Sequence, residues 1–273
     1  MTSPEPPHPP AEPEVPVWVP FLAMFIVLFL VAIFSTALFG VLSATDPSIE
    51  DSDDVPVGVT QALTFLQDGI FILVAVIAVQ LSLGRASREF FGLRPPTSLR
   101  DALRWSVIAY GVFWGAAIAL ALIFGDPDPQ PLVDDLKQED ALGVLLAWAL
   151  LICIAAPIAE EFFFRGFIFT VFLRKLGLLW AVLLNGALFG ALHVGGEAIQ
   201  LVALGAFGAG LCLLYWRTKS IIPCMALHAL NNSITFGVTK ELDPGLFVAT
   251  VVLSVGFVIA AGTAVSARTR VPA

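Results

Sequence analysis

Long apolar runs separated by short polar loops dominate this sequence. A helix needs about 17 to 25 apolar residues to cross the hydrocarbon core of a bilayer, and most of these runs reach that length. We assign eight spans: Val17–Ser43, Gln61–Leu83, Trp105–Phe124, Leu142–Leu173, Leu176–Val194, Ala198–Trp216, Ile221–Phe236 and Leu246–Val265. The pattern therefore predicts an all-α fold, a polytopic transmembrane helical bundle of about eight spans.

The fourth run, Leu142–Leu173, is too long for one perpendicular span. Pro157 lies in its middle, where it removes a backbone hydrogen bond and kinks or breaks a helix. We therefore expect two helical pieces, the second covering Ile158–Leu173.

The chain divides into four parts. Residues 1–16 are rich in Pro and Glu and predict a disordered tail. Residues 17–140 hold the first transmembrane helices, 141–238 hold the residues suited to chemistry, and 239–273 hold the last helix and a tail.

Composition places the chain in a membrane: 58% of its residues are hydrophobic and 13% charged, with a mean hydropathy of +0.90. The net charge of -8 comes from acidic loops and the tail. Placing both termini in the cytoplasm puts 11 basic residues inside and two, Lys137 and Lys240, outside, as the positive-inside rule requires. We expect an integral protein of the plasma (inner) membrane. The basic residues follow this topology and indicate no nucleic-acid partner.

Three charged side chains interrupt an apolar run at Glu160, Glu161 and Arg165. Ionised groups within a bilayer are costly, so such a cluster indicates a functional site. Glu161 and Arg165 have the i, i+4 spacing of a helical ion pair. Glu160 is rotated by about 100° from Glu161, so we assign Glu160 to chemistry and Glu161 to pairing with Arg165. A purely structural ion-pair cluster is the alternative.

The two histidines that follow the tail both lie in apolar helices. Phe189 precedes His193 by one helical turn, and His228 precedes Asn232 by one turn. Taken singly, each pattern also suits a packing or hydrogen-bonding residue. Counted at about 1.5 Å per residue from the basic helix ends, the kinked fourth run puts Glu160 at a depth similar to theirs.

The order Glu-Glu-x-x-x-Arg, Phe-x-x-x-His, His-x-x-x-Asn on three apolar helices resembles the CPBP family, the CAAX-protease and bacteriocin-processing (ABI) intramembrane endopeptidases. The resemblance covers roughly Ala141 to Gly237, and Asn232 fills a slot that some members fill with another polar residue. The segment Phe90–Pro95 adds a weak second match, to the loop before the family's core.

The resemblance implies hydrolysis of a peptide bond in a membrane-associated peptide or protein, as in CAAX-type prenyl proteases. Glu160 and His193 would activate water, and His228 and Asn232 would stabilise the oxyanion. Phe189, Glu161 and Arg165 would support the site.

Two mechanisms fit these residues. In one, His193, His228 and a glutamate bind zinc, as in a metalloprotease. In the other no metal is needed. Asn232 is a poor zinc ligand but a good hydrogen-bond donor, which slightly favours this second mechanism. Cys153, Cys212 and Cys224 lie in apolar runs without CxxC spacing, which argues against a thiolate zinc site.

Two other classes compete with a protease. An ion-coupled transporter would also carry intramembrane charges, but the charge cluster has no counterpart in the N-terminal half, as an inverted repeat would require. A non-catalytic immunity or scaffold protein would have little reason to keep these costly polar residues. The substrate, its prenylation and the oligomeric state stay open.

Overall fold

A computed structural model describes residues 14–51, 54–125, 131–193 and 197–267. These residues form helices joined by turns, with no strand among them. The elements are α1 (Val19–Thr45), α2 (Val57–Leu83), α3 (Leu99–Phe124), α4 (Pro131–Gln138), α5 (Leu142–Leu150), η2 (Leu151–Ala155), α6 (Ala156–Glu161), η3 (Phe162–Phe169), α7 (Thr170–Leu192), α8 (Ala198–Thr218), α9 (Ile222–Thr239) and α10 (Pro244–Ala267). Most of the predicted tail, and the predicted helix end at Val194, lie outside the described residues.

Six helical segments are long and apolar enough to cross a membrane. The polytopic all-α bundle is thereby confirmed, and two features explain the difference from eight spans. Leu142–Leu192 counts as one segment, although the chain turns within it at Gly177, whose φ of 76° and ψ of 173° are not helical. Helix α9 is not counted, because His228, Asn231 and Asn232 lower its hydropathy.

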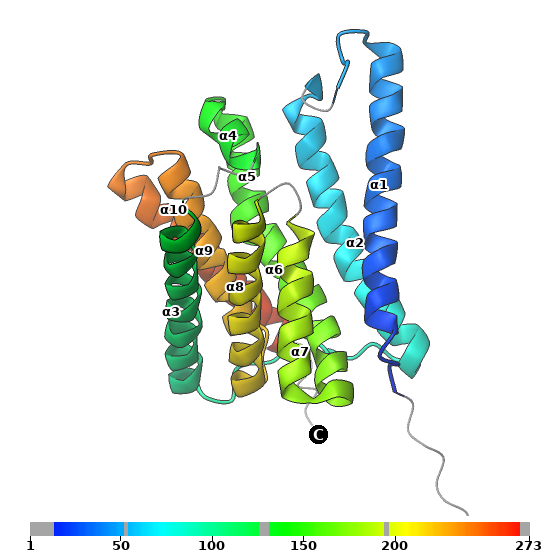
Figure 1. Cartoon of the computed structure of the whole chain (residues 1–273), viewed down its shortest axis with the longest axis vertical. Helices are drawn as coiled ribbons and strands as arrows, with labels where there is room; N and C mark the ends of the chain where they lie inside the picture. The colour runs from blue at the N-terminus through cyan, green and yellow to red at the C-terminus, as the bar shows by residue number, and fades with distance from the viewer. Residues whose placement is uncertain (1–13, 52–53, 126–130, 194–196, 268–273) are drawn as a thin grey trace, which may run out of the picture.

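The α2–α3 connection and the N-terminal end of α1 lie at one end of the bundle, opposite α4 (Figure 1). Arg88 in the α2–α3 connection donates to the Val265 carbonyl at 2.7 Å. Lys175 in α7 pairs with Glu14, which precedes α1. The two ends of the described chain therefore lie at the same end of the molecule, as the predicted topology requires. Which side of the membrane this end faces stays a prediction.

Pro157 does not break its helix, so the predicted division into two pieces is wrong. Helix α5 widens into the π-helical turn η2, in which the Ala156 N–H donates to the Leu151 carbonyl five residues back. The next carbonyl, that of Ile152, lacks its donor because proline has no N–H. The Asn232 side chain donates to this carbonyl at 2.9 Å. A side chain of α9 thus satisfies the group that Pro157 leaves free, as membrane helices permit.

Helices α7 and α8 pack at very short range through Gly186 and Gly190, which have the GxxxG spacing. A Cβ at Gly186 would lie 2.8 Å from the Gly205 carbonyl oxygen, and one at Gly190 would overlap the Leu201 carbonyl oxygen. Only glycine permits this approach. The close packing fixes the C-terminal end of α7, where His193 lies.

The α2–α3 connection packs beneath the core through residues 90–94. The Phe91 ring stacks on Phe162 with ring centroids 4.3 Å apart. Gly92 has a φ of 67°, and a Cβ there would lie 2.7 Å from the Tyr215 Oη. Its carbonyl accepts from the Ile221 N–H at 3.1 Å, and Arg94 Nε donates to the Lys219 carbonyl at 2.7 Å. This connection therefore joins η3 to the α8–α9 turn.

Candidate functional site

The two glutamates end α6, immediately before the second widened segment, η3. Short π-helical segments often mark functional sites, because they change the direction of side chains within a helix. The side chain of Glu160 is 12% exposed, and that of Glu161 is fully buried. The two neighbours thus have different surroundings, as their helical rotation predicted.

The predicted ion pair between Glu161 and Arg165 is present and completely buried. Arg165 Nη1 donates to Glu161 Oε1 at 2.8 Å, and its Nη2 donates to the Gly208 carbonyl at 3.0 Å. The guanidinium carbon lies 4.4 Å from the ring centroid of Phe189. These contacts compensate part of the cost of burying the arginine and connect η3 with α7 and α8.

His228 from α9 contacts both glutamates. Its Nδ1 lies 2.8 Å from Glu161 Oε1, and its Nε2 lies 3.9 Å from Glu160 Oε2. Because Glu161 is an ionised partner of Arg165, its oxygen accepts, and the Nδ1 of His228 must carry a proton. The ring is thereby oriented with Nε2 toward Glu160.

His193 lies at the C-terminal end of α7 and is half-buried. Its Nδ1 is 2.9 Å from the carbonyl oxygen of Phe189, which can only accept, so this nitrogen carries the proton. In the neutral ring, Nε2 is then an unprotonated base. Among the described residues, no ion pair joins His193 to either glutamate.

The Phe189 ring lies between the two imidazoles. Its centroid is 5.1 Å from that of His193 and 5.8 Å from that of His228. The same ring also covers Arg165. A supporting role for Phe189 in the site stays a prediction.

Asn232 is one turn beyond His228 on α9, but the structure uses its amide differently from the sequence prediction. One N–H reaches the Ile152 carbonyl, and Oδ1 accepts from Asn231 at 3.3 Å. An amide has two N–H donors, so one remains for another acceptor.

Asn185 is completely buried in α7, although no sequence pattern predicted a role for it. Its Nδ2 donates to the Phe164 carbonyl at 2.9 Å, and its Oδ1 accepts from Cys212 Sγ at 3.0 Å. Thr170 Oγ1 similarly donates to the Arg165 carbonyl at 3.1 Å. The only sequence signal was a lone amide in an apolar helix. These side chains satisfy carbonyls in η3 and so hold Arg165 in place.

The zinc alternative stays a prediction. Each imidazole directs Nδ1 at a protein oxygen, that of Glu161 for His228 and that of the Phe189 carbonyl for His193. Only Nε2 of either ring is therefore open to a metal ion. Among the described residues, no group of three or more His, Cys, Asp or Glu side chains is placed to hold a metal ion. We therefore derive no step through a metal.

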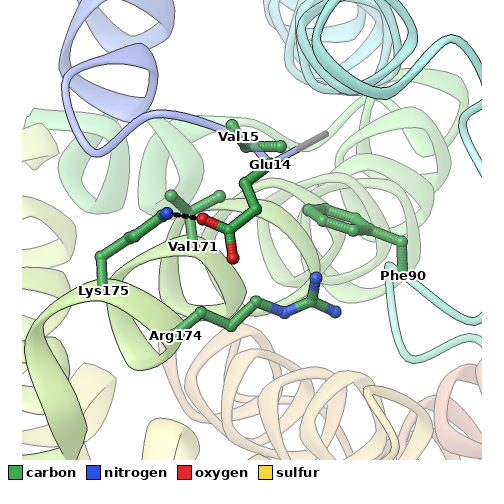
Figure 2. A pocket seen from close by; sticks show the side chains of 6 residues that line it. All are labelled: Glu14, Val15, Phe90, Val171, Arg174 and Lys175. Carbon is green, nitrogen blue, oxygen red and sulfur yellow. Dashed lines mark hydrogen bonds and ion pairs between the residues drawn. The ribbon is translucent and has the colours of Figure 1, made fainter. Parts of the chain in front are cut away.

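A separate small pocket opens at the end of the bundle opposite α4, which we call the basic end because Arg174 and Lys175 line the pocket (Figure 2). Lys175 pairs with Glu14, and the Arg174 guanidinium lies 5.0 Å from the Phe90 ring centroid. The hydrogen bond from Lys175 holds the pKa of the exposed Glu14 carboxyl below its ordinary value. This pocket contains none of the predicted site residues.

The fold and the site define an integral membrane protein with a buried polar centre built from α6, η3, α7 and α9. Residues 142–234 match the family described as type II CAAX prenyl endopeptidase Rce1-like. This match contains the glutamate, histidine and asparagine positions of the site, and it confirms the family resemblance for this part of the chain.

A relative in Bacillus subtilis (strain 168), named "Putative membrane peptidase YdiL", is 33% identical over 111 residues. The aligned region covers 40% of this chain and 44% of the relative. The chain therefore spans less than half the length of this relative. No solved structure matches the chain.

Proposed function

We propose that the protein is an intramembrane endopeptidase that hydrolyses a peptide bond in a membrane-associated substrate. The observation that supports this most is the contact of His228 with both glutamates, 2.8 Å from Glu161 and 3.9 Å from Glu160. The family match over residues 142–234 gives independent support.

Glu160 is the proposed general base, because it is the glutamate that the ion pair with Arg165 leaves uncommitted. Its carboxylate removes a proton from water as the water oxygen attacks the peptide carbonyl carbon. The proton then passes to the amide nitrogen as the C–N bond breaks. His193 presents an unprotonated Nε2 and assists Glu160 in the proton transfers that follow the attack.

His228 and Asn232 are the proposed donors to the oxyanion. With Nδ1–H directed at Glu161, His228 can donate from Nε2 only as the doubly protonated ring. The two adjacent carboxylates would stabilise that cation. Asn232 contributes its second N–H, while its first is anchored on Ile152.

The experiment is cleavage of a panel of membrane-anchored peptides, prenylated and unprenylated, by purified protein in vesicles. Glu160→Gln should abolish turnover, and the matched control Glu89→Gln, at an exposed glutamate, should cleave at the wild-type rate. Cleavage by Glu160→Gln would refute the assigned base. Activity that survives chelation supports the metal-free mechanism, and chelator loss restored by zinc would refute it. An inactive wild-type protein would refute the proposed activity.

A further inference from the structure

A third acidic side chain, Asp68, faces the site from α2. It lies on the face of α2 that packs against α6 and η3, and it is only 5% exposed. Both of its carboxyl oxygens are buried without a hydrogen-bond partner among the described residues. An acid buried in this way inside a membrane helix costs free energy, so it needs a functional explanation.

Helix packing places Asp68 at the level of Glu160. Helix α2 and the α6–η3 segment run in the same direction (Figure 1), and the ring centroids of Phe71 and Phe163 are 4.8 Å apart. Asp68 precedes Phe71 by three residues, and Glu160 precedes Phe163 by three residues. Each acid thus lies about one helical turn before its phenylalanine in the Phe71–Phe163 contact. They lie close enough for their charges to interact.

The Glu160 carboxyl group also has an oxygen that lacks a hydrogen-bond partner among the described residues. Its Oε2 is buried without a hydrogen bond, and His228 Nε2, at 3.9 Å, is beyond hydrogen-bond distance. Asp68 and Glu160 therefore present three buried oxygens that no described protein group satisfies. Two ionised carboxylates at short range repel strongly in a medium of low dielectric constant, so a neutral acid beside a carboxylate is the less costly state.

We infer that Asp68 is a further catalytic residue, a neutral carboxylic acid that holds the attacking water together with Glu160. This inference rests on the proposed function. The carbonyl oxygen of the Asp68 acid accepts one O–H of the water, and the other O–H is directed at Glu160. The water oxygen keeps a lone pair for the peptide carbonyl carbon.

The protons balance without a further reactant. Glu160 takes one proton from the water as the C–O bond forms. The same proton passes to the amide nitrogen when the C–N bond breaks, giving a free amine and a carboxylic acid. Asp68 keeps its own proton throughout, so an amide at this position, with the same acceptor oxygen, should replace it in part.

The test compares Asp68→Leu and Asp68→Asn with the control Gln61→Leu, which removes a buried side chain of the same helix that donates to the Val144 carbonyl. We expect Asp68→Leu to lower kcat by about 100-fold with KM unchanged, as misplacement of the attacking water does. Its thermal midpoint should not fall, because an unpaired acid is removed. Asp68→Asn should stay within about tenfold of wild type, and Gln61→Leu should keep the wild-type kcat.

Wild-type turnover by Asp68→Leu would overturn the inference, and so would an Asn variant as slow as the Leu variant. If no peptide is cleaved, the proposed function fails, and infrared spectroscopy still decides the pairing of the two acids. We expect a carbonyl stretching band of a protonated carboxylic acid that Asp68→Asn removes and Glu160→Gln shifts. Absence of that band, or a band that Glu160→Gln leaves unmoved, would overturn the pairing.

Discussion

His228 and Arg165 bind the same oxygen of Glu161: the Nδ1 of His228 and the Nη1 of Arg165 each lie 2.8 Å from Oε1. The carboxylate of the ion pair predicted from the sequence thus also binds a histidine from another helix, α9. Glu161 therefore links the stability of η3 to the orientation of the His228 ring.

Glu161→Gln should reduce stability more than Glu160→Gln does. The first change leaves the fully buried Arg165 without its carboxylate partner, and breaking a buried ion pair costs about 3–5 kcal/mol. The ion-pair contact of Glu160 with His228, at 3.9 Å, is beyond hydrogen-bond distance, so Glu160→Gln should unfold near the wild-type temperature. Thermal unfolding of both variants in detergent measures the difference. Equal midpoints would contradict this division of roles.

Gly190→Ala should separate α7 from α8. The added methyl group would overlap the Leu201 carbonyl oxygen and lie 3.0 Å from the Gly205 amide nitrogen, and both belong to backbone that cannot rotate away. We expect a lower thermal midpoint and, because His193 ends α7, slower cleavage. Gly111→Ala in α3 is the matched control, since a Cβ there meets nothing within 4 Å. A Gly190→Ala variant as stable as this control would refute the close packing.

Gly92→Ala should destabilise the basic end of the bundle. Its φ of 67° disfavours a side chain, and the new Cβ would lie 2.7 Å from Tyr215 Oη. Strain at such a position costs about 1–3 kcal/mol. Gly84→Ala, with a φ of 72° but open space around its Cβ, separates the backbone effect from the clash. Unfolding in detergent should show a larger loss for Gly92→Ala, and equal losses would rule out a contribution from Tyr215.

The contact between Glu14 and Lys175 should depend on pH. The hydrogen bond from Lys175 lowers the pKa of Glu14 when the segment is docked, so the contact contributes above the ordinary carboxyl pKa of 4.5 and is lost as pH falls through the lowered value. Amide hydrogen exchange at residues 14–18 should rise over that range relative to Glu14→Gln, which lacks the charge. Identical exchange in the two proteins at neutral pH would show that the ion pair does not dock this segment.

The sequence was sufficient for the parts of the site that depend on helical spacing. Glu161 and Arg165 pair as i and i+4 residues, and Phe189 lies one turn before His193 in the same helix. The family pattern also selected His228, whose partners come from a helix distant in the sequence.

Other features depend on contacts between helices that spacing does not specify. Pro157 was expected to break its helix, because the sequence does not show that Asn232 can replace the missing donor. No role could be predicted for Asp68 or Asn185, since a lone polar residue in an apolar run is uninformative until its neighbours are known. Helix widening in η2 and η3 has no sequence pattern of its own.

The hydrogen bond between Asn232 and the Ile152 carbonyl also bears on how this protein can change during evolution. It exists because proline at 157 provides no N–H, so a lineage that replaces Pro157 restores a backbone donor and makes the first N–H of Asn232 redundant. Conversely, a lineage that loses the amide at 232 while keeping the proline leaves a carbonyl unsatisfied. Substitutions at positions 157 and 232 should therefore be correlated. The order in which the two residues change decides whether the intermediate sequence has an unsatisfied Ile152 carbonyl.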